Sequence, residues 1–257
     1  PIYQYLGEGL TFLLVILVGS FIVYSSYRFN NKLSKQQNNF MLSVTHELKS
    51  PIAAMKLILQ TLQRHQLNPE KQQLLIDKCI VESDRLNELC NNVLIASQME
   101  GGQYTSEWQK ISITDLLQHS FEAYNARYSN RFELYSLPNV SADTDKMLLQ
   151  LVLNNVLENA IKYTPADSKI EMHLLLSDKM VTIAVKDKGN GIPDVEKKKI
   201  FNQFYRVGDE NTRKTKGTGL GLYLSKKIMK SLKGNIIVKN NTPKGSVFEI
   251  SLPSSIG

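Results

Sequence analysis

The sequence predicts a multidomain chain with a membrane-spanning helix, a pair of bundle-forming helices and an α/β domain. Three observations predict this order. An uncharged apolar run lies near the start, apolar repeats of helical period follow it, and the second half of the chain alternates between helix-period and strand-period patterns. With 257 residues, of which 42% are hydrophobic and 21% charged, the chain can form more than one core, and its composition excludes disordered and fibrous proteins.

The apolar run covers residues 9–27 and contains no charged side chain. As a helix it would span about 28 Å, close to the thickness of the hydrocarbon core of a bilayer. A signal peptide is the alternative, but no basic segment precedes the run and its apolar stretch is long. Basic residues follow the run while only Glu8 precedes it, so we expect the C-terminal side in the cytoplasm. Residues 1–8 would then be an extracytoplasmic remnant, and because the sequence begins with Pro1 we expect a processed chain or a fragment.

The cysteines and the net charge point to no special chemistry. Cys79 and Cys90 form no Cys-x-x-Cys motif, which predicts packing roles in a reducing compartment. The net charge of +7 comes from dispersed basic residues, apart from those after the apolar run and those in residues 213–216. We interpret this charge as a solvated basic surface rather than a nucleic-acid-binding one.

Two long helices are predicted after the apolar run. The polar residues 28–39 lack proline and glycine, so a helix could run almost continuously from the membrane to the next segment. A second helix is predicted over residues 69–100, with Asn68 as its cap, and its apolar residues form a narrow seam. Narrow seams on two helices cannot be buried within one chain. We therefore predict that residues 40–102 form an antiparallel four-helix bundle with a second copy in a homodimer.

His46 lies on the side of the first bundle helix that is opposite its apolar stripe. Glu47 is its neighbour and Ser50 lies one turn further along the exposed face. Pro51 removes the hydrogen bond to the carbonyl of Glu47, which predicts a weakened or kinked helix just after the histidine. A lone histidine is more often an ordinary surface residue, but beside a carboxylate and a hinge it is a candidate reactive group.

From residue 111 to residue 257 the pattern is typical of an α/β domain, joined to the bundle by a linker at residues 103–110 that follows two glycines. A sheet covered by helices on one side is the simplest packing for it. The expected elements are, in order, helix 114–128, strand 132–135, helix 145–163, strands 170–176 and 181–186, a helix ending at 232, and strands 236–239 and 248–252.

Polar residues gather on one face of the predicted helix 145–163. Asn155, Asn159 and Lys162 share this face at helical spacing. Buried amides without partners would cost about 1–3 kcal/mol each, so a polar ligand or a metal ion is expected beside them. A solvated helix face is the alternative.

Two glycine-rich segments follow. Asp187 comes at the end of a strand and is followed by Gly189 and Gly191, which permit a tight turn and a close ligand approach. Residues 216–222 lead directly into a helix, and glycine backbone at a helix N-terminus suits phosphate oxygens. The segment is neither a Rossmann fingerprint nor a Walker loop.

In this order, the motifs resemble those of sensor histidine kinases of two-component systems. His-Glu-Leu-Lys-Ser-Pro at residues 46–51 resembles the phosphoacceptor segment, and the nucleotide segments, together with residues 200–206, resemble the N, G1, F and G2 boxes. The resemblance implies a HisKA-type dimerisation domain and a Bergerat-fold α/β sandwich similar to gyrase and Hsp90 ATPases. It implies ATP and Mg²⁺ as cofactors, and a response-regulator receiver domain and the lipid bilayer as partners. It also implies kinase domains on the cytoplasmic side of a bacterial inner membrane, without direct nucleic-acid binding.

The resemblance assigns roles residue by residue. His46 would accept the phosphoryl group and Glu47 would orient or deprotonate its ring. Ser50 replaces the threonine or asparagine that positions water for dephosphorylation of the partner, which leaves a phosphatase activity open. Asn159 would bind Mg²⁺, and residues 207–215 would form a mobile lid. The implied ATP-binding residues are Asn155, Asn159, Lys162, Tyr163, Asp187, Gly189, Gly191, Ile192, Phe201, Phe204, Arg206, Lys216, Gly217, Thr218, Gly219, Leu220 and Gly221.

Asn155 stands where the related ATPases have a glutamate that activates water, and asparagine cannot be a general base. We therefore expect bound ATP to persist until His46 attacks it. Two alternatives are a membrane scaffold with a decayed kinase domain and an ATP hydrolase of the gyrase or Hsp90 kind. The hydrolase needs a carboxylate near Asn155, and Glu158 is the nearest in sequence.

Overall fold

The computed structural model describes residues 2–128, 130–177, 179–207 and 219–254. The chain divides into two compact units, Pro1–His46 and Glu47–Gly257. Helix α1, Ile2–Arg64, begins in the first unit and ends in the second.

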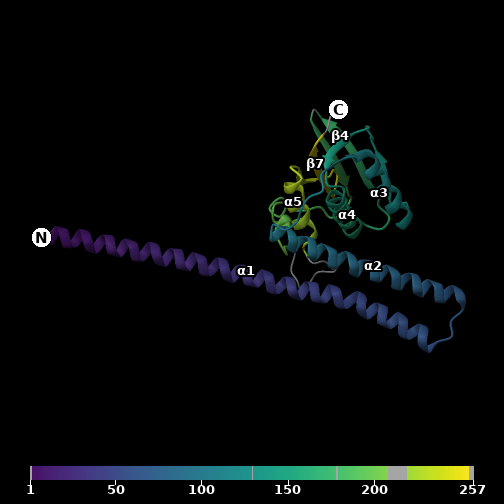
Figure 1. The fold of residues 1–257 in the computed structure, drawn as a ribbon, viewed down its shortest axis with the longest axis horizontal. Helices are drawn as coiled ribbons and strands as arrows, with labels where there is room; N and C mark the ends of the chain where they lie inside the picture. Colours follow the sequence, from purple (N-terminus) through teal and green to yellow (C-terminus); the bar gives the residue numbers. More distant parts are fainter. Residues whose placement is uncertain (1, 129, 178, 208–218, 255–257) are drawn as a thin grey trace. The chain divides into compact units, whose positions relative to one another are not determined.

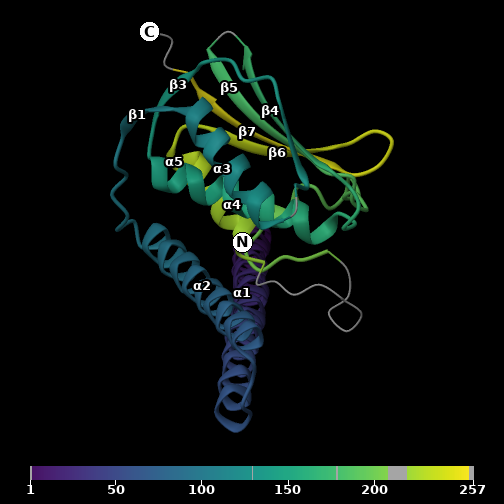
Figure 2. The same cartoon turned by 90° about the vertical axis from the view of Figure 1, so that its right-hand side faces the viewer.

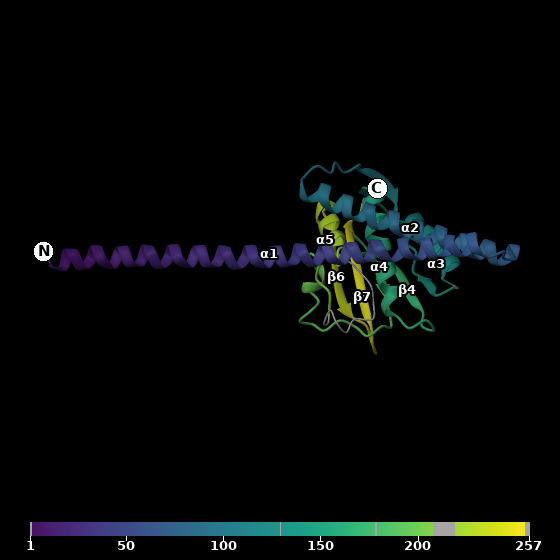
Figure 3. The same ribbon diagram turned by 90° about the horizontal axis from the view of Figure 1, so that it is seen from below.

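Helix α1 is uninterrupted, as Figure 1 and Figure 3 show. The helix predicted through residues 28–39 is therefore confirmed. Within α1, the segment Gly9–Asn31 is long and apolar enough to cross a membrane. Pro51 lies inside α1 without ending it, and the weakening or kink expected just after His46 stays a prediction. A single proline removes one hydrogen bond and leaves the bonds on either side of it in place.

Helix α2, Pro69–Glu100, has the bounds that the sequence predicts. The side chain of Asn68 accepts a hydrogen bond from the backbone nitrogen of Lys71 at 3.0 Å, and Gly101 caps the other end. Ala96 is the buried residue of this helix. Leu75 and Val93 of the predicted seam are half-buried, whereas Leu74 and Ile80 beside the seam are each 54% exposed. Helix α2 therefore leaves apolar side chains uncovered within the described chain.

A five-stranded sheet forms the centre of the α/β domain, with strand order β2-β4-β5-β7-β6. Strands β2 and β4 are parallel, and the other neighbours are antiparallel. The strands are β2 Phe132–Tyr135, β4 Ile170–Ser177, β5 Met180–Lys186, β6 Asn235–Asn240 and β7 Ser246–Pro253. All five were predicted within a few residues. A separate antiparallel pair, β1 (Gln109–Ser112) and β3 (Ser141–Thr144), was not predicted.

Three helices, α3 (Ile113–Arg127), α4 (Lys146–Tyr163) and α5 (Gly221–Ser231), lie together on one side of the sheet (Figure 2). Alternate strand residues face these helices and are fully buried, for example Met172 and Leu174 of β4. Leu153 of α4 is buried with them. A short 3₁₀ turn, η1 (Lys199–Phe201), precedes α5. The prediction of a sheet covered by helices on one side is therefore confirmed.

Asp145 joins the segment before β1 to the start of α4. Its carboxylate is buried, and Oδ1 accepts the backbone N–H of Leu148 at 3.0 Å as a helix cap. Its Oδ2 accepts the backbone N–H of Glu107 at 2.9 Å and the hydroxyl of Tyr104 at 3.4 Å. Residues 103–110, which we expected to be a linker, thus include the first half of β1 and contacts to α4.

Candidate nucleotide-binding site

The polar face of α4 forms the first part of the site. Asn155, Asn159 and Lys162 are half-buried there, while the opposite face of the helix packs into the core. Burial lowers the pKa of Lys162, and the guanidinium of Arg206 lowers it further. The Nζ of Lys162 lies 5.4 Å from the ring centroid of Tyr163. A partly desolvated cation beside two amides suits an anionic ligand such as a phosphate group.

Asp187 lies directly after β5 and is buried. Its Oδ1 accepts the backbone N–H of Gly189 at 2.8 Å and that of Ser246 at 3.2 Å. Burial raises the pKa of this carboxyl, and these two hydrogen bonds partly oppose the rise. A fixed, buried carboxylate of this kind is an acceptor for the amino group of a purine.

Gly189 brings the Asp187 segment against the end of α4. A Cβ on Gly189 would lie 2.6 Å from the carbonyl oxygen of Tyr163, so only glycine allows this approach. Asn241 supports the same turn, because its Nδ2 donates to the carbonyl oxygen of Asp187 at 2.8 Å. The predicted N-box and G1-box segments therefore touch each other.

The segment after η1 contacts the glycines before α5. Phe204 has φ 63° and Gly219 has φ 71°, both in the left-handed region. The backbone N–H of Phe204 donates to the carbonyl oxygen of Gly219 at 3.1 Å, and a Cβ on Gly219 would lie 2.8 Å from the carbonyl carbon of Phe204. Gly219 therefore needs to be glycine for both conformation and space.

Helix α5 begins against α4. A Cβ on Gly221, the first residue of α5, would lie 2.9 Å from Oδ1 of Asn155. The amide of Asn155 also donates to the hydroxyl of Ser225, one turn into α5, at 3.3 Å. Since the other pairs of segments meet as well, the structure brings all four predicted nucleotide segments together in one unit.

The remaining predicted residues are placed as follows. Ile192 and Phe201 pack against the core, Leu220 is buried just before α5, and Arg206 is half-buried. His46 is exposed on α1 and is the last residue of the first compact unit. Glu47 and Ser50 are half-buried on α1, in the second unit. Lys216, Gly217 and Thr218 lie outside the described residues, as do residues 208–215 of the expected lid.

The carboxylate that a hydrolase would need is engaged elsewhere. Glu158 accepts a hydrogen bond from the hydroxyl of Tyr128, which follows α3, at 3.3 Å. Burial raises the pKa of Tyr124 on α3, and the charge of Glu158 raises it further. Glu158 thus interacts with the α3 side of α4, whereas Asn155 interacts with α5.

The donor set of the site fits Mg²⁺ bound together with phosphates. No group of three His, Cys, Asp or Glu side chains suited to a metal ion occurs among the described residues. Mg²⁺ is commonly held by one or two protein oxygens plus the phosphates of a nucleotide, and it keeps several waters. Asn155 and Asn159 offer amide oxygens one turn apart on the same half-buried face.

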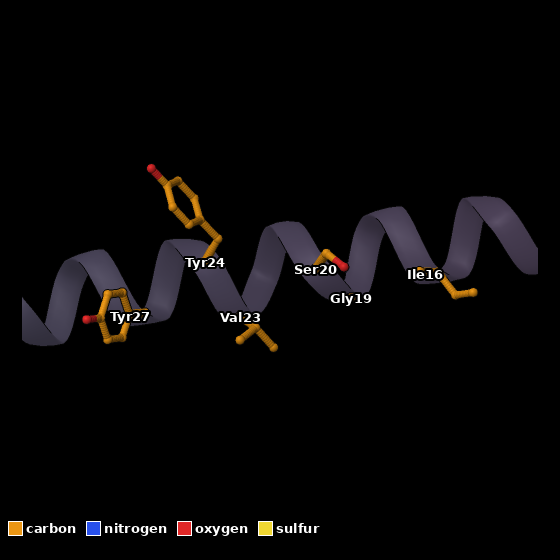
Figure 4. A pocket seen from close by; sticks show the side chains of 6 residues that line it. All are labelled: Ile16, Gly19, Ser20, Val23, Tyr24 and Tyr27. Carbon is orange, nitrogen blue, oxygen red and sulfur yellow. The ribbon is translucent and has the colours of Figure 1, made fainter.

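A shallow concave surface on α1 is a separate feature. Figure 4 shows its six lining residues, which all belong to the apolar segment of one helix: Ile16, Gly19, Ser20, Val23, Tyr24 and Tyr27. One helix cannot enclose a small ligand. The surface therefore does not compete with the α4 site as a catalytic centre.

Sequence reasoning missed three residues that support the site. Ser225 contacts Asn155, Ser246 donates to Asp187, and Asn241 holds the turn after Asp187. Ser225 could have been noticed from its place one turn after Gly221 on a helix with few other small polar residues. Asn241 and Ser246 flank the segment 242–245 that connects β6 to β7, but pairing them with Asp187 requires the β5–β7 register.

Two known families match the chain in sequence. Residues 36–102 match the His Kinase A (phospho-acceptor) domain, and residues 144–256 match the histidine kinase-, DNA gyrase B-, and HSP90-like ATPases. The sensor protein CiaH of Streptococcus pneumoniae is 30% identical over 247 residues, which are 93% of this chain and 54% of that protein. The chain spans about half the length of the curated relatives it matches.

Solved structures agree with these matches. The mycobacterial sensor histidine kinase MprB superposes with a TM-score of 0.51 at 26% identity, covering 58% of this chain and 98% of that one. Histidine kinase ThkA, solved in complex with the response regulator protein TrrA, has a TM-score of 0.57 at 22% identity. The match covers 90% of this chain and 66% of ThkA and shows likeness of fold alone. Because a phospho-acceptor match and an ATPase match follow each other on one chain, the protein belongs to the histidine kinases of two-component systems.

Proposed function

We propose that this chain is the kinase part of a membrane-bound sensor that phosphorylates itself on His46 and passes the phosphoryl group to an aspartate of a response regulator. The observation that carries the proposal is the meeting of four nucleotide segments around a half-buried amide face of α4, whose one carboxylate, Glu158, accepts a hydrogen bond from Tyr128 instead. Such a site holds ATP without hydrolysing it quickly. His46 supplies the nucleophile on a separate, exposed helix position.

In the first step, an imidazole nitrogen of His46 attacks the γ-phosphorus of ATP, and the bond between that phosphorus and the β-bridging oxygen breaks to release ADP. Glu47 lies next to the ring in sequence and orients it or takes its proton. The half-buried cations Lys162 and Arg206 stabilise negative charge on the phosphates. In the second step, the phosphoryl group moves from the nitrogen to a carboxylate oxygen of the regulator.

We assign the nucleotide contacts to the residues implied by the family motifs. Asp187 accepts the adenine amino group, with Gly189, Gly191 and Ile192 shaping the pocket around the base. Asn159 holds Mg²⁺ with support from Asn155, and the metal ion, when bound, neutralises phosphate charge. Lys216, Gly217 and Thr218 would contact the phosphates from the segment before Gly219.

Apolar side chains that stay exposed on both bundle helices support a homodimer. Leu57 and Leu59 of α1 are 65% and 57% exposed, and Leu94 of α2 is 54% exposed. A soluble domain that leaves large apolar side chains in rows along two helices needs a partner surface. A second copy supplies one through a four-helix bundle.

Membrane anchoring and the partner protein are parts of the same proposal. The segment Gly9–Asn31 would cross the inner membrane once and place the kinase part in the cytoplasm. The partner would be a receiver domain, since the fold relative ThkA was solved with a response regulator. We assign no direct nucleic-acid binding to the chain.

Labelling with γ-³²P-ATP tests the proposal. The full chain should acquire acid-labile label with Mg²⁺, and His46→Gln should lose it entirely while still binding ATP. His65→Gln is the matched control, because His65 lies exposed just after α1 and should not matter. Label that persists in His46→Gln, or steady release of free phosphate by the wild-type chain without labelling, would overturn the proposal.

A further inference from the structure

Ser225 is a buried polar residue that connects α5 to the polar face of α4. Its side chain is fully buried. Its hydroxyl donates to the carbonyl oxygen of Gly221 at 2.8 Å, and the Nδ2 of Asn155 donates to it at 3.3 Å. Ser225 is not among the residues that the family motifs assign.

The directions of these two hydrogen bonds fix the orientation of the Asn155 amide. A serine hydroxyl has one proton. When that proton is donated to the carbonyl of Gly221, the hydroxyl oxygen can only accept from Asn155. The NH₂ end of the amide must therefore face Ser225, because the oxygen end would place two acceptors against each other.

The oxygen end of Asn155 points toward the start of α5. Its Oδ1 lies 2.9 Å from where a Cβ of Gly221 would be, so it occupies space that only glycine leaves open. The start of α5 is where backbone N–H groups are available to phosphates. The carbonyl oxygen, a ligand type that Mg²⁺ accepts, is thus held beside the proposed phosphate site.

We propose that Ser225 is a positioning residue that keeps the carbonyl oxygen of Asn155 turned toward the Mg²⁺–ATP complex; this inference rests on the proposed function. Among the described residues the bond to Ser225 is the hydrogen bond that sets the direction of this amide, so the amide can turn over once the hydroxyl is removed. A turned amide would present NH₂ hydrogens, which repel a cation. The result is weaker Mg²⁺-dependent binding without loss of the nucleotide pocket itself.

Ser120 provides a matched control within the same domain. It is buried on α3, donates to the carbonyl oxygen of Leu116 at 2.9 Å, and accepts the Nε2 of Gln150 at 2.9 Å. This is the same arrangement of helical serine, preceding-turn carbonyl and amide from α4. No predicted nucleotide residue takes part in it, so Ser120→Ala measures the cost of losing such a hydroxyl for stability alone.

The experiment titrates Mg²⁺ into the full chain with a fluorescent ATP analogue. In Ser225→Ala the Mg²⁺ concentration for half-maximal binding should rise about 10-fold, as for other residues that orient a metal ligand. Binding of the analogue in EDTA should equal that of the wild type. Ser120→Ala should stay within about twofold of the wild type, and Ser225→Thr, which keeps the hydroxyl, should resemble the wild type. Equal behaviour of Ser225→Ala and Ser120→Ala would overturn the inference and leave the proposed function standing.

A double-mutant cycle tests whether Ser225 acts through Asn155. In an Asn155→Ala background, Ser225→Ala should add no further Mg²⁺ requirement, since no amide remains to be oriented. A full additional 10-fold effect in that background would contradict the inference. A wild-type chain whose ATP binding does not depend on Mg²⁺ would overturn the inference, whereas a wild-type chain that acquires no acid-labile label would overturn the proposed function.

Discussion

The bundle helices and the α/β domain differ in how they bury apolar side chains. In the α/β domain, residues such as Leu149, Leu153 and Met172 are fully buried within one chain. In α2, Ala96 alone is buried among its described residues, while Leu74 remains 54% exposed. The domain therefore closes its own core, whereas the helices carry an apolar surface that needs a partner.

This difference separates two kinds of stability in one molecule. The unfolding free energy of the α/β domain should not depend on protein concentration, whereas that of the helical part should, because association contributes to it. Trp108, the only tryptophan in the sequence, reports on the domain, since the Nζ of Lys233 lies 5.5 Å from its ring centroid.

The largest expected effect comes from the domain core. Leu153→Ala removes a fully buried side chain from α4 and should lower the unfolding free energy of the domain by about 3 kcal/mol. Urea unfolding followed by Trp108 fluorescence measures this loss at several protein concentrations. A cost that changes with concentration would contradict a core closed within one chain.

Leu59→Ala is the corresponding change in the helical part. Because Leu59 is 57% exposed in the single chain, the Trp108 transition should not move. The dissociation constant of the dimer should rise about tenfold, equivalent to about 1.4 kcal/mol. Analytical ultracentrifugation measures it, and an unchanged dissociation constant would place the dimer interface elsewhere.

Glycine substitutions sharpen the same contrast. Gly219→Ala should cost about 1–3 kcal/mol and weaken ATP binding, because Gly219 has φ 71° and its Cβ would press on the backbone of Phe204. Gly101→Ala at the end of α2 meets only ordinary contacts at 3.6 Å and has φ −75°, so it should be neutral or stabilising by up to about 1 kcal/mol. Thermal unfolding and ATP titration of both variants check the pair. Equal losses of unfolding free energy at the two positions would contradict the difference in packing between the α/β domain and the helical part.

Asp187→Asn should separate nucleotide binding from stability. ATP affinity should fall about tenfold or more, since a hydrogen bond to a charged acceptor is lost. Burial raises the pKa of Asp187, so the folded domain keeps this proton at pH values where the unfolded chain has released it. As the pH rises through the raised pKa, ionisation of Asp187 lowers the unfolding free energy of the folded domain. Without ATP, Asp187→Asn should therefore be more stable than the wild type at pH 7.

Calorimetric ATP titration and unfolding midpoints at pH 4 and pH 7 test this pair of effects. Wild-type affinity for ATP should also decline as the pH falls into the range where Asp187 takes up its proton. A variant that binds ATP as the wild type does would remove Asp187 from the adenine site.

The smallest expected effect lies where α2 meets the domain. The carboxylate of Glu100 accepts the hydroxyl of Tyr223 at 3.1 Å and the Nε2 of Gln203 at 2.7 Å. Burial and the bond to Glu100 raise the pKa of Tyr223 to about 12, so the contact persists through neutral pH and is lost only in strong alkali. Tyr223→Phe should cost about 0.5–1 kcal/mol and speed proteolysis after α2 about threefold. Tyr135→Phe is the control, because its hydroxyl bonds only locally to Glu133 at 2.6 Å, and an equal effect there would count against the contact.

Much of this fold follows from local pattern. The cap at Asn68 and the proline after it define the start of α2, and the period-2 runs define the strands of the large sheet. Strands β1 and β3 escaped prediction because each has only four, mostly polar residues, which show no clear alternation of apolar and polar side chains. Only the pairing of the two segments with each other makes them strands.

The sequence predicted which residues belong to the site better than it predicted the contacts between them. The helical spacing of Asn155, Asn159 and Lys162 placed them on one face without further information. Ser225 is separated from Asn155 by 70 positions, so their hydrogen bond depends on how α4 and α5 pack. The predicted roles of the individual site residues stay predictions until binding is measured.

The contacts of the Asp145 carboxylate determine which residues must be transferred together with the α/β domain when domains are exchanged between kinases. The ATPase family match begins at residue 144, but Asp145 holds the backbone of Glu107 and the hydroxyl of Tyr104. A graft that starts at Ile111 would leave Oδ2 of a buried carboxylate without these donors and remove half of β1. A graft that starts at Gln103 carries them along, so a chimaera should be joined between Glu100 and Gln103, at the glycines that end α2.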